Sequence, residues 1–170
     1  MTDDDWQCLF FELGVSIRYH AHRAAFFRLL DTTNGVLSLF AGSAAAASAM
    51  SDHPLAATAF GAAIALSNAV NVMAGSARKM GAHRGLRARF IALEKEMKVS
   101  EPSEAVYRHI LNDRASLEAE EPESLGALYA LAYNEQLRAL GIKDGYAKRP
   151  WYQRILKNVW DFESQLDATT

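Results

Sequence analysis

The sequence is poor in residues that cross-link a chain or interrupt a helix. Its single cysteine, Cys8, cannot form an intrachain disulfide, which is typical of a protein in a reducing compartment. Prolines are few, and each stands where a helix begins or a turn falls: Pro54, Pro102, Pro122 and Pro150. Runs that alternate apolar and polar residues, as β-strands do, are missing. We therefore expect an all-α protein.

The sequence also lacks the motifs of common enzymes. It contains no glycine-rich phosphate-binding loop, no dinucleotide-binding glycine pattern and no nucleophile elbow. His20 and His22 are two residues apart and so point away from each other on a helix, which excludes a shared metal ion. The basic stretch around His83 has no interleaved aromatic residues of the kind that bind nucleic acid. We expect no enzymatic activity, no catalytic or metal-binding residues, no cofactor and no nucleic-acid partner.

Charge is missing altogether from two long tracts. Residues 32–51 and 54–77 contain no Asp, Glu, Lys, Arg or His, and only the short stretch SDHP interrupts them. A helix rises about 1.5 Å per residue, so about 20 apolar residues cross a hydrocarbon core of about 30 Å. Both tracts reach that length. We therefore expect a long antiparallel helical hairpin over residues 1–99, with two candidate membrane-spanning segments, followed by three shorter C-terminal helices.

Basic residues flank these tracts on one side only. Arginines precede the first tract, further Lys and Arg residues follow the second, and the turn between the tracts has neither. Under the positive-inside rule, this asymmetry predicts a plasma-membrane protein with both termini in the cytoplasm. The residues expected to form a basic cluster at the membrane surface are Arg18, Arg23, Arg28, Arg78, Lys79, Arg84 and Arg87.

The tracts are rich in small residues, which leaves a second interpretation open. Ala, Gly and Ser suit close packing between helices more than contact with lipid. Asn68 and Asn71 share a helix face and need hydrogen-bond partners between helices, so we expect them to line an interhelical polar seam. The alternative is a soluble, Ala-rich helical oligomer in the cytoplasm, acting as a scaffold or as a structural protein of a phage or mobile element.

The last third of the chain predicts shorter helices. Residues 100–141 are expected to form a cytoplasmic pair of helices. Residues 142–170 are expected to form an amphipathic helix, in which basic residues surround Trp151, Tyr152 and Trp160. The aromatic face of this helix either lies in the bilayer interface or packs on the helical bundle, and packing is the expectation.

The order of these parts resembles the SLATT family, which comprises bacterial two-transmembrane effector domains associated with nucleotide-sensing defence systems. The resemblance covers roughly residues 15–141. It depends on the stretch RYHAHRAAFFRLL before the first tract, ARKMGAHRGLRARF after the second, and ALYALAYNEQLRALG later in the chain. The residues that carry it are Tyr19, His22, Arg23, Phe26, His83, Arg87, Phe90, Leu93 and Asn134.

The resemblance implies a function that the residue patterns alone do not. SLATT proteins are thought to form homo-oligomers that perturb the bacterial inner membrane or form a pore in it, during anti-phage or cell-suicide defence. The partners implied for this chain are therefore the lipid bilayer, further copies of itself and a separate signal-sensing protein.

Overall fold

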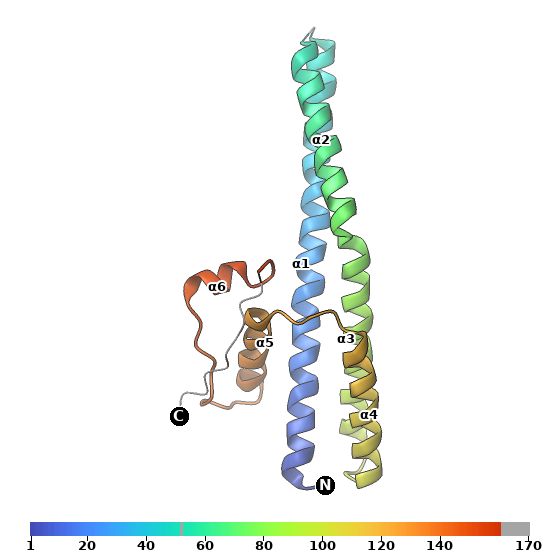
Figure 1. Ribbon diagram of the computed structural model, residues 1–170, viewed down its shortest axis with the longest axis vertical. Helices are drawn as coiled ribbons and strands as arrows, with labels where there is room; N and C mark the ends of the chain where they lie inside the picture. The colour runs from blue at the N-terminus through green and yellow to red at the C-terminus, as the bar shows by residue number, and fades with distance from the viewer. Residues whose placement is uncertain (52, 161–170) are drawn as a thin grey trace. The chain divides into compact units, whose positions relative to one another are not determined.

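A computed structural model describes residues 1–51 and 53–160, and the regular secondary structure in these ranges is entirely helical (Figure 1). The all-α prediction is therefore confirmed for this part of the chain. Residues 161–170 of the predicted C-terminal helix lie outside the described residues. The helices are α1 (Asp3–Met50), α2 (Pro54–Ala74), α3 (Ser76–Val99), α4 (Glu104–Glu120), α5 (Gly126–Ala139) and α6 (Trp151–Leu156).

Two of the helices begin at side chains that cap them. At the start of α1, the Asp5 N–H donates to Thr2 Oγ1 at 3.1 Å, and the Thr2 N–H donates to Asp5 Oδ2 at 2.7 Å. This reciprocal pair satisfies amide groups that have no partner within the helix. At the start of α4, Ser103 Oγ accepts a hydrogen bond from the Val106 N–H at 3.3 Å. Polar residues next to apolar periodic stretches thus set where these helices begin.

A break at Gly75 separates α2 from α3, although the sequence pattern is compatible with one helix from Pro54 to about Lys98. Gly75 has φ of 62° and ψ of 34°, which is the left-handed conformation that glycine adopts without steric cost. Its N–H donates to the Val72 carbonyl oxygen at 3.0 Å, and its own carbonyl oxygen accepts from the Lys79 N–H at 2.9 Å. The direction of the chain therefore changes at Gly75.

The chain divides into two compact units. Unit 1 comprises Met1–Arg23 together with the described residues from His83 onward, and unit 2 comprises Ala24–Ala82. Helices α1 and α3 each contribute to both units. The segment 1–99, which the sequence predicts as one hairpin, therefore supplies residues to both units as well.

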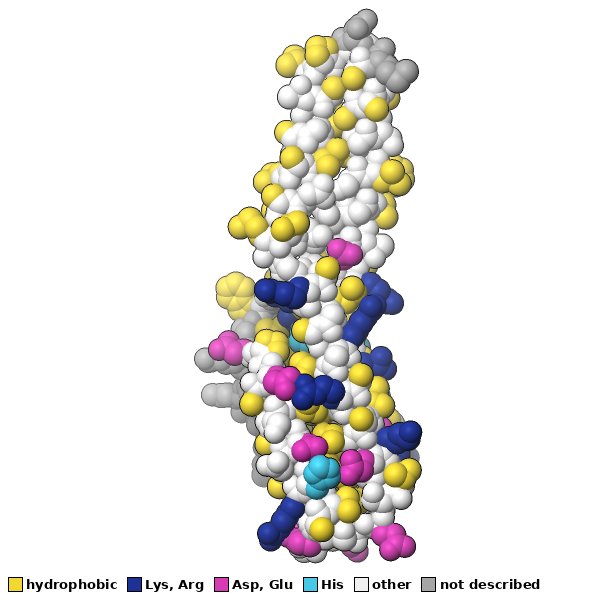
Figure 2. Space-filling view, turned by 90° about the vertical axis from the view of Figure 1, so that its right-hand side faces the viewer, with side chains coloured by type: hydrophobic (Ala, Val, Ile, Leu, Met, Phe, Trp, Pro, Cys, Tyr) yellow, Lys and Arg dark blue, Asp and Glu magenta, His cyan; other side chains and the backbone are white. Residues whose placement is uncertain are grey.

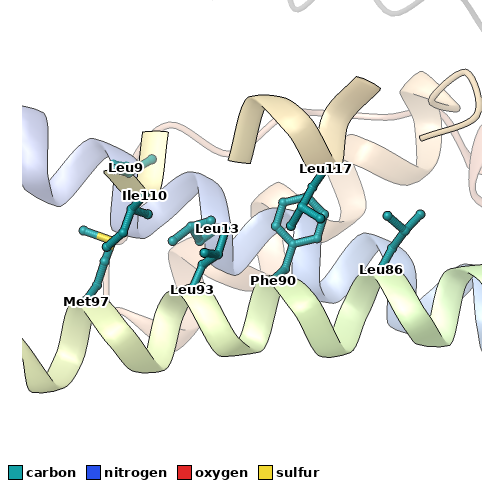
Figure 3. Packing of buried hydrophobic residues seen from close by; sticks show 8 residues of the cluster. All are labelled: Leu9, Leu13, Leu86, Phe90, Leu93, Met97, Ile110 and Leu117. Atoms are coloured by element: carbon teal, nitrogen blue, oxygen red, sulfur yellow. The ribbon is translucent and has the colours of Figure 1, made fainter. Parts of the chain in front are cut away.

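Unit 1 contains the hydrophobic core, which forms on two sides of α1. Side chains of α1, α3 and α4 make one cluster, with Phe90 and Ile110 fully buried (Figure 3). A second, smaller cluster joins α1 to α5 through Val15, Tyr19 and Leu128. The first cluster consists of Leu9, Leu13, Leu86, Phe90, Leu93, Met97, Ile110 and Leu117.

A close approach of α5 to α1 at Gly14 gives a first prediction. A Cβ atom at Gly14 would lie 2.2 Å from Nε2 of Gln136, whose side chain is buried. We expect Gly14→Ala to lower the free energy of unfolding by about 1–3 kcal/mol, because the Gln136 amide must move out of a packed site. Urea unfolding of the full chain, followed by circular dichroism, measures this effect.

Gly85 provides the matched control, because it lies within α3 and no atom of a neighbouring group comes within 4 Å of the position of its Cβ. Gly85→Ala should raise the free energy of unfolding by up to about 1 kcal/mol through helix propensity alone. Equal effects of the two substitutions would show that the contact between Gly14 and Gln136 is absent in solution.

Unit 2 has almost no buried side chains. Helix α2 contains none, and among the residues of this unit whose side chains the structure describes, only Ala24, Phe27 and Ser76 are buried. Large apolar side chains face outward instead: Leu66 is 68% exposed and Met73 is 87% exposed. On the face drawn in Figure 2, charged side chains are absent from the half of unit 2 that adjoins the turn between α1 and α2. Unit 2 thus presents apolar groups to its surroundings.

The prediction of two membrane-spanning candidates is wrong in one respect. Among the described helices, only the stretch Pro54–Val99 is long and apolar enough to cross a membrane, with a mean hydropathy of 1.5 over 18 residues. The tract 32–51 does not qualify, because polar and small residues such as Asn34, Gly35 and Ser38 lower its mean hydropathy. Length and composition therefore support one spanning segment.

Candidate functional site

Three polar side chains toward the end of α2, those of Ser67, Asn68 and Asn71, bond to α1. Asn68 Oδ1 accepts hydrogen bonds from Asn34 Nδ2 at 2.9 Å and from Ser38 Oγ at 3.1 Å. Asn71 Nδ2 donates to Asp31 Oδ1 at 3.3 Å. Both asparagines that the sequence analysis selected therefore bond to the neighbouring helix. We call the set Asp31, Asn34, Ser38, Ser67, Asn68 and Asn71 the polar seam.

The register of the polar seam fixes how the two segments run. Asp31 pairs with Asn71, and Asn34 pairs both with Asn68 and with Ser67, whose hydroxyl donates to Asn34 Oδ1 at 2.6 Å. Residues that come later in α1 bond to residues that come earlier in α2. The two segments are therefore antiparallel in unit 2. Sequence reasoning found Asn68 and Asn71 from their helical spacing, but it did not predict their α1 partners.

An open cavity of about 310 Å³ lies beside the polar seam. Its lining is mainly apolar, and the hydroxyl of Ser76, at the start of α3, is buried there without a hydrogen-bond partner among the described residues. The cavity is lined by Leu30, Thr33, Asn34, Leu37, Ser67, Val70, Asn71, Ala74 and Ser76. Close packing of α2 on α1 is therefore incomplete where α2 ends.

Most of the predicted basic cluster is exposed. Arg28, Arg78 and Lys79 are exposed residues of unit 2, and Lys79 Nζ lies 5.6 Å from the ring centroid of Phe27. Arg84 and Arg87 are exposed residues of unit 1. These five side chains are placed where an anionic surface can reach them.

Two members of that predicted cluster are engaged within unit 1 instead. Arg18 is half-buried, and its Nη1 donates to the Gly14 carbonyl oxygen of the same helix at 3.3 Å. Arg23 is also half-buried; its Nη1 donates to the Asn158 carbonyl oxygen at 2.9 Å, and burial lowers the pKa of its guanidinium from the ordinary value. Arg23 thus holds the C-terminal segment against α1.

A buried histidine pair lies in unit 1. His20 and His83 are 0% and 2% exposed, and their Nδ1 atoms are 2.9 Å apart, so one donates a hydrogen bond to the other. His20 Nε2 donates to Glu121 Oε1 at 2.8 Å, and the His20 ring stacks on Phe90. The pair therefore joins α1 and α3 to the residue that ends α4.

The histidine pair gives a second prediction, by a double-mutant cycle. We expect His20→Leu and His83→Leu each to lower the free energy of unfolding by about 1–3 kcal/mol, because each leaves a buried ring nitrogen without its partner. The double substitution should lower the free energy of unfolding by at least about 1 kcal/mol less than the sum of the two single effects. The reason is that it removes both polar groups of the pair, so that neither ring leaves the other without a partner. Urea unfolding of the full chain measures all four states, and additive costs would show that the rings do not interact.

The residues that carry the SLATT resemblance lie mainly in the contacts of unit 1. His22 Nε2 pairs with Glu135 Oε2 at 2.8 Å, and Tyr19 Oη accepts from the Leu125 N–H at 3.1 Å. Asn134 bonds both backbone groups of Ala147, each at 2.9 Å. Tyr19 and His22 thus connect α1 to α5 and its N-cap residue, whereas Asn134 connects α5 to the loop that follows it. No group of three His, Cys, Asp or Glu residues within the described ranges is arranged to hold a metal ion.

Comparison with protein-family models, with curated proteins and with solved structures finds no match to this chain. Each unit has its own character. Unit 2 has a hydrogen-bonded polar seam between α1 and α2 and exposed large apolar side chains, and unit 1 has a conventional hydrophobic core.

Proposed function

We propose that the chain is an oligomeric membrane effector, in which α2 crosses the lipid bilayer with residues 32–51 beside it. One observation carries this proposal: the large apolar side chains of unit 2 are exposed, while Asn68 and Asn71 are hydrogen-bonded to the neighbouring helix α1. A water-soluble helical pair has the opposite arrangement, because exposed apolar surface is costly in water. In hydrocarbon the same arrangement is favourable, since lipid cannot hydrogen-bond to amides.

The length of α2 agrees with this role. Its 21 residues correspond to about 31 Å of helix, close to the roughly 30 Å of a hydrocarbon core. Asn68 and Asn71 would be expensive facing lipid, and in unit 2 they bond to α1 instead. The helix therefore meets both requirements of a spanning segment, length and internal satisfaction of its polar groups.

Residues 32–51 are proposed to enter the bilayer as a partner of α2. Their composition is too polar for a strong independent span, but their polar side chains are the ones that bond to α2. At Gly42 a Cβ would lie 3.8 Å from Ile64 Cδ1, an ordinary packing distance, so this part of α1 packs against α2. Packing against α2 thus offsets the modest hydropathy of this tract.

The charge distribution supports an orientation. The exposed basic residues Arg28, Arg78 and Lys79 flank the uncharged tracts at one end of unit 2, and the turn after Met50 contains no Lys or Arg. Under the positive-inside rule, both termini lie in the cytoplasm, and unit 1 with them. Unit 1 is then the part of the chain that a separate signal-sensing protein reaches.

The proposed activity is disruption of the membrane by assembled copies. A single pair of helices encloses no channel, so a conducting path requires several copies, with their small-residue faces in contact. The resemblance to SLATT effectors, together with the polar seam, supports a role in bacterial anti-phage or cell-suicide defence. The matching helices before and after the tracts carry that resemblance.

The experiment is inducible expression of the full chain in a bacterial host, with a membrane-potential dye as the readout. The proposal expects loss of membrane potential before loss of protein synthesis. Purified chain in liposomes should likewise release an entrapped dye. A host that keeps its membrane potential, together with liposomes that retain the dye, contradicts the proposed activity.

A further inference from the structure

The C-terminal segment of residues 148–160 exposes its apolar side chains to solvent. Trp151 is 73% exposed and Trp160 is 66% exposed, and Ile155 and Val159 are comparably open. Its polar residues Gln153, Lys157 and Asn158 are less exposed than these apolar ones, so the usual amphipathic arrangement is inverted. The expectation that the aromatic face packs on the helical bundle does not hold for these residues. We call Trp151, Tyr152, Ile155, Leu156, Val159 and Trp160 the aromatic patch.

The segment is held in place rather than free at its ends. Before it, both backbone groups of Ala147 bond to the side chain of Asn134 on α5. Near its end, the Asn158 carbonyl oxygen accepts from Arg23 on α1 at 2.9 Å. Contacts at both ends therefore keep the polar side turned inward and leave the aromatic patch exposed.

The composition of the segment identifies what covers the patch. Tryptophan and tyrosine are enriched at the boundary between lipid headgroups and acyl chains, because their rings are apolar and carry one polar group. The residues from 145 to 160 contain no Asp or Glu, and their basic residues include Lys148, which is exposed, and Arg149 and Lys157, which are half-buried. A patch of exposed rings among basic residues is complementary to anionic headgroups above an apolar layer.

We propose that the aromatic patch binds the interfacial region of an anionic lipid bilayer. This inference rests on the proposed function in placing a bilayer beside unit 1, but it concerns a different part of the chain. Arg23 connects this segment to the part of α1 that belongs to unit 1. The patch is a second membrane contact besides α2.

The test uses the native tryptophans of the full chain as reporters in liposomes that contain lipids brominated at a known depth. Trp6→Phe leaves Trp151 and Trp160, and we expect loss of their fluorescence with bromine near the headgroups, and a smaller loss with bromine deep in the acyl chains. The matched control is the variant with Trp151→Phe and Trp160→Phe, which retains only Trp6, a partly buried residue packed against the core of unit 1. Its fluorescence should be unchanged by brominated lipid.

Each outcome separates this proposal from the proposed function. The patch proposal is overturned if the fluorescence of the Trp6→Phe variant is not quenched. It is also overturned if the control variant is quenched equally, or if the Trp6→Phe variant is quenched equally in neutral and anionic liposomes. The same samples are extracted with alkaline carbonate to test α2. Quenching of an extractable chain supports the patch and contradicts insertion, whereas a resistant chain without quenching supports insertion and contradicts the patch.

Discussion

Leu66→Arg abolishes stable membrane association of the full chain, and this is the largest effect that we expect. Leu66 lies near the middle of α2 and is 68% exposed, so in a bilayer it faces lipid. An arginine at the centre of a spanning helix costs about 2.5–3.5 kcal/mol on insertion scales, which is roughly 100-fold in the insertion equilibrium. The fraction of chain that sediments with membranes after alkaline carbonate extraction measures this effect.

Leu111→Arg is the matched control, because Leu111 is an exposed leucine on α4 in unit 1. It faces water in the proposed arrangement, where such changes usually alter stability by no more than about 0.5 kcal/mol. The control should therefore sediment like the unmodified chain. If Leu66→Arg and Leu111→Arg sediment equally, the outward face of α2 does not contact lipid.

Asn68→Leu combined with Asn71→Leu removes the toxicity of the chain while leaving its insertion intact. The two amides are two of the three α2 members of the polar seam, with Ser67 the third. Leucine makes α2 more apolar, so insertion is maintained or improved. Assembly of a polar path between helices depends on groups that leucine cannot replace. We expect liposome dye release to fall at least about tenfold, as expected for loss of three interhelical hydrogen bonds of about 1 kcal/mol each.

Thr58 and Ser43 supply the control for the seam. Their hydroxyls donate to the backbone of their own helices, at Pro54 O and Leu39 O. Thr58→Leu with Ser43→Leu makes the same number of polar-to-leucine changes in unit 2 without altering the polar seam. Dye release should persist in this variant. Unchanged dye release in the asparagine variant would show that Asn68 and Asn71 have no part in the activity.

Periodicity and composition predicted those features that depend on neighbours along one helix. Asn68 and Asn71 are three residues apart, so the sequence alone shows that they share a face. The separation of His20 from His22 follows in the same way, and in the structure His20 contacts His83 whereas His22 contacts Glu135. Such features require only the geometry of a helix.

The remaining features depend on contacts between segments distant in sequence. His20 and His83 are 63 residues apart, and nothing in either local pattern indicates a shared hydrogen bond. The break at Gly75 was not predicted either, because a glycine inside a helical pattern is usually tolerated. The exposure of Trp151 likewise depends on distant contacts, because the hydrogen bonds of Arg23 and Asn134 fix which side of the C-terminal segment faces inward. The local sequence pattern does not determine any of these three features.

The central claim is that unit 2 resides in a lipid bilayer, and carbonate extraction of the unmodified chain from host membranes tests it most directly. Alkaline carbonate releases peripheral proteins but leaves spanning helices in the membrane. The account predicts that the full chain stays in the pellet and needs detergent for its release. Recovery of the chain in the supernatant, as a monodisperse species without detergent, would contradict it and favour the soluble Ala-rich oligomer.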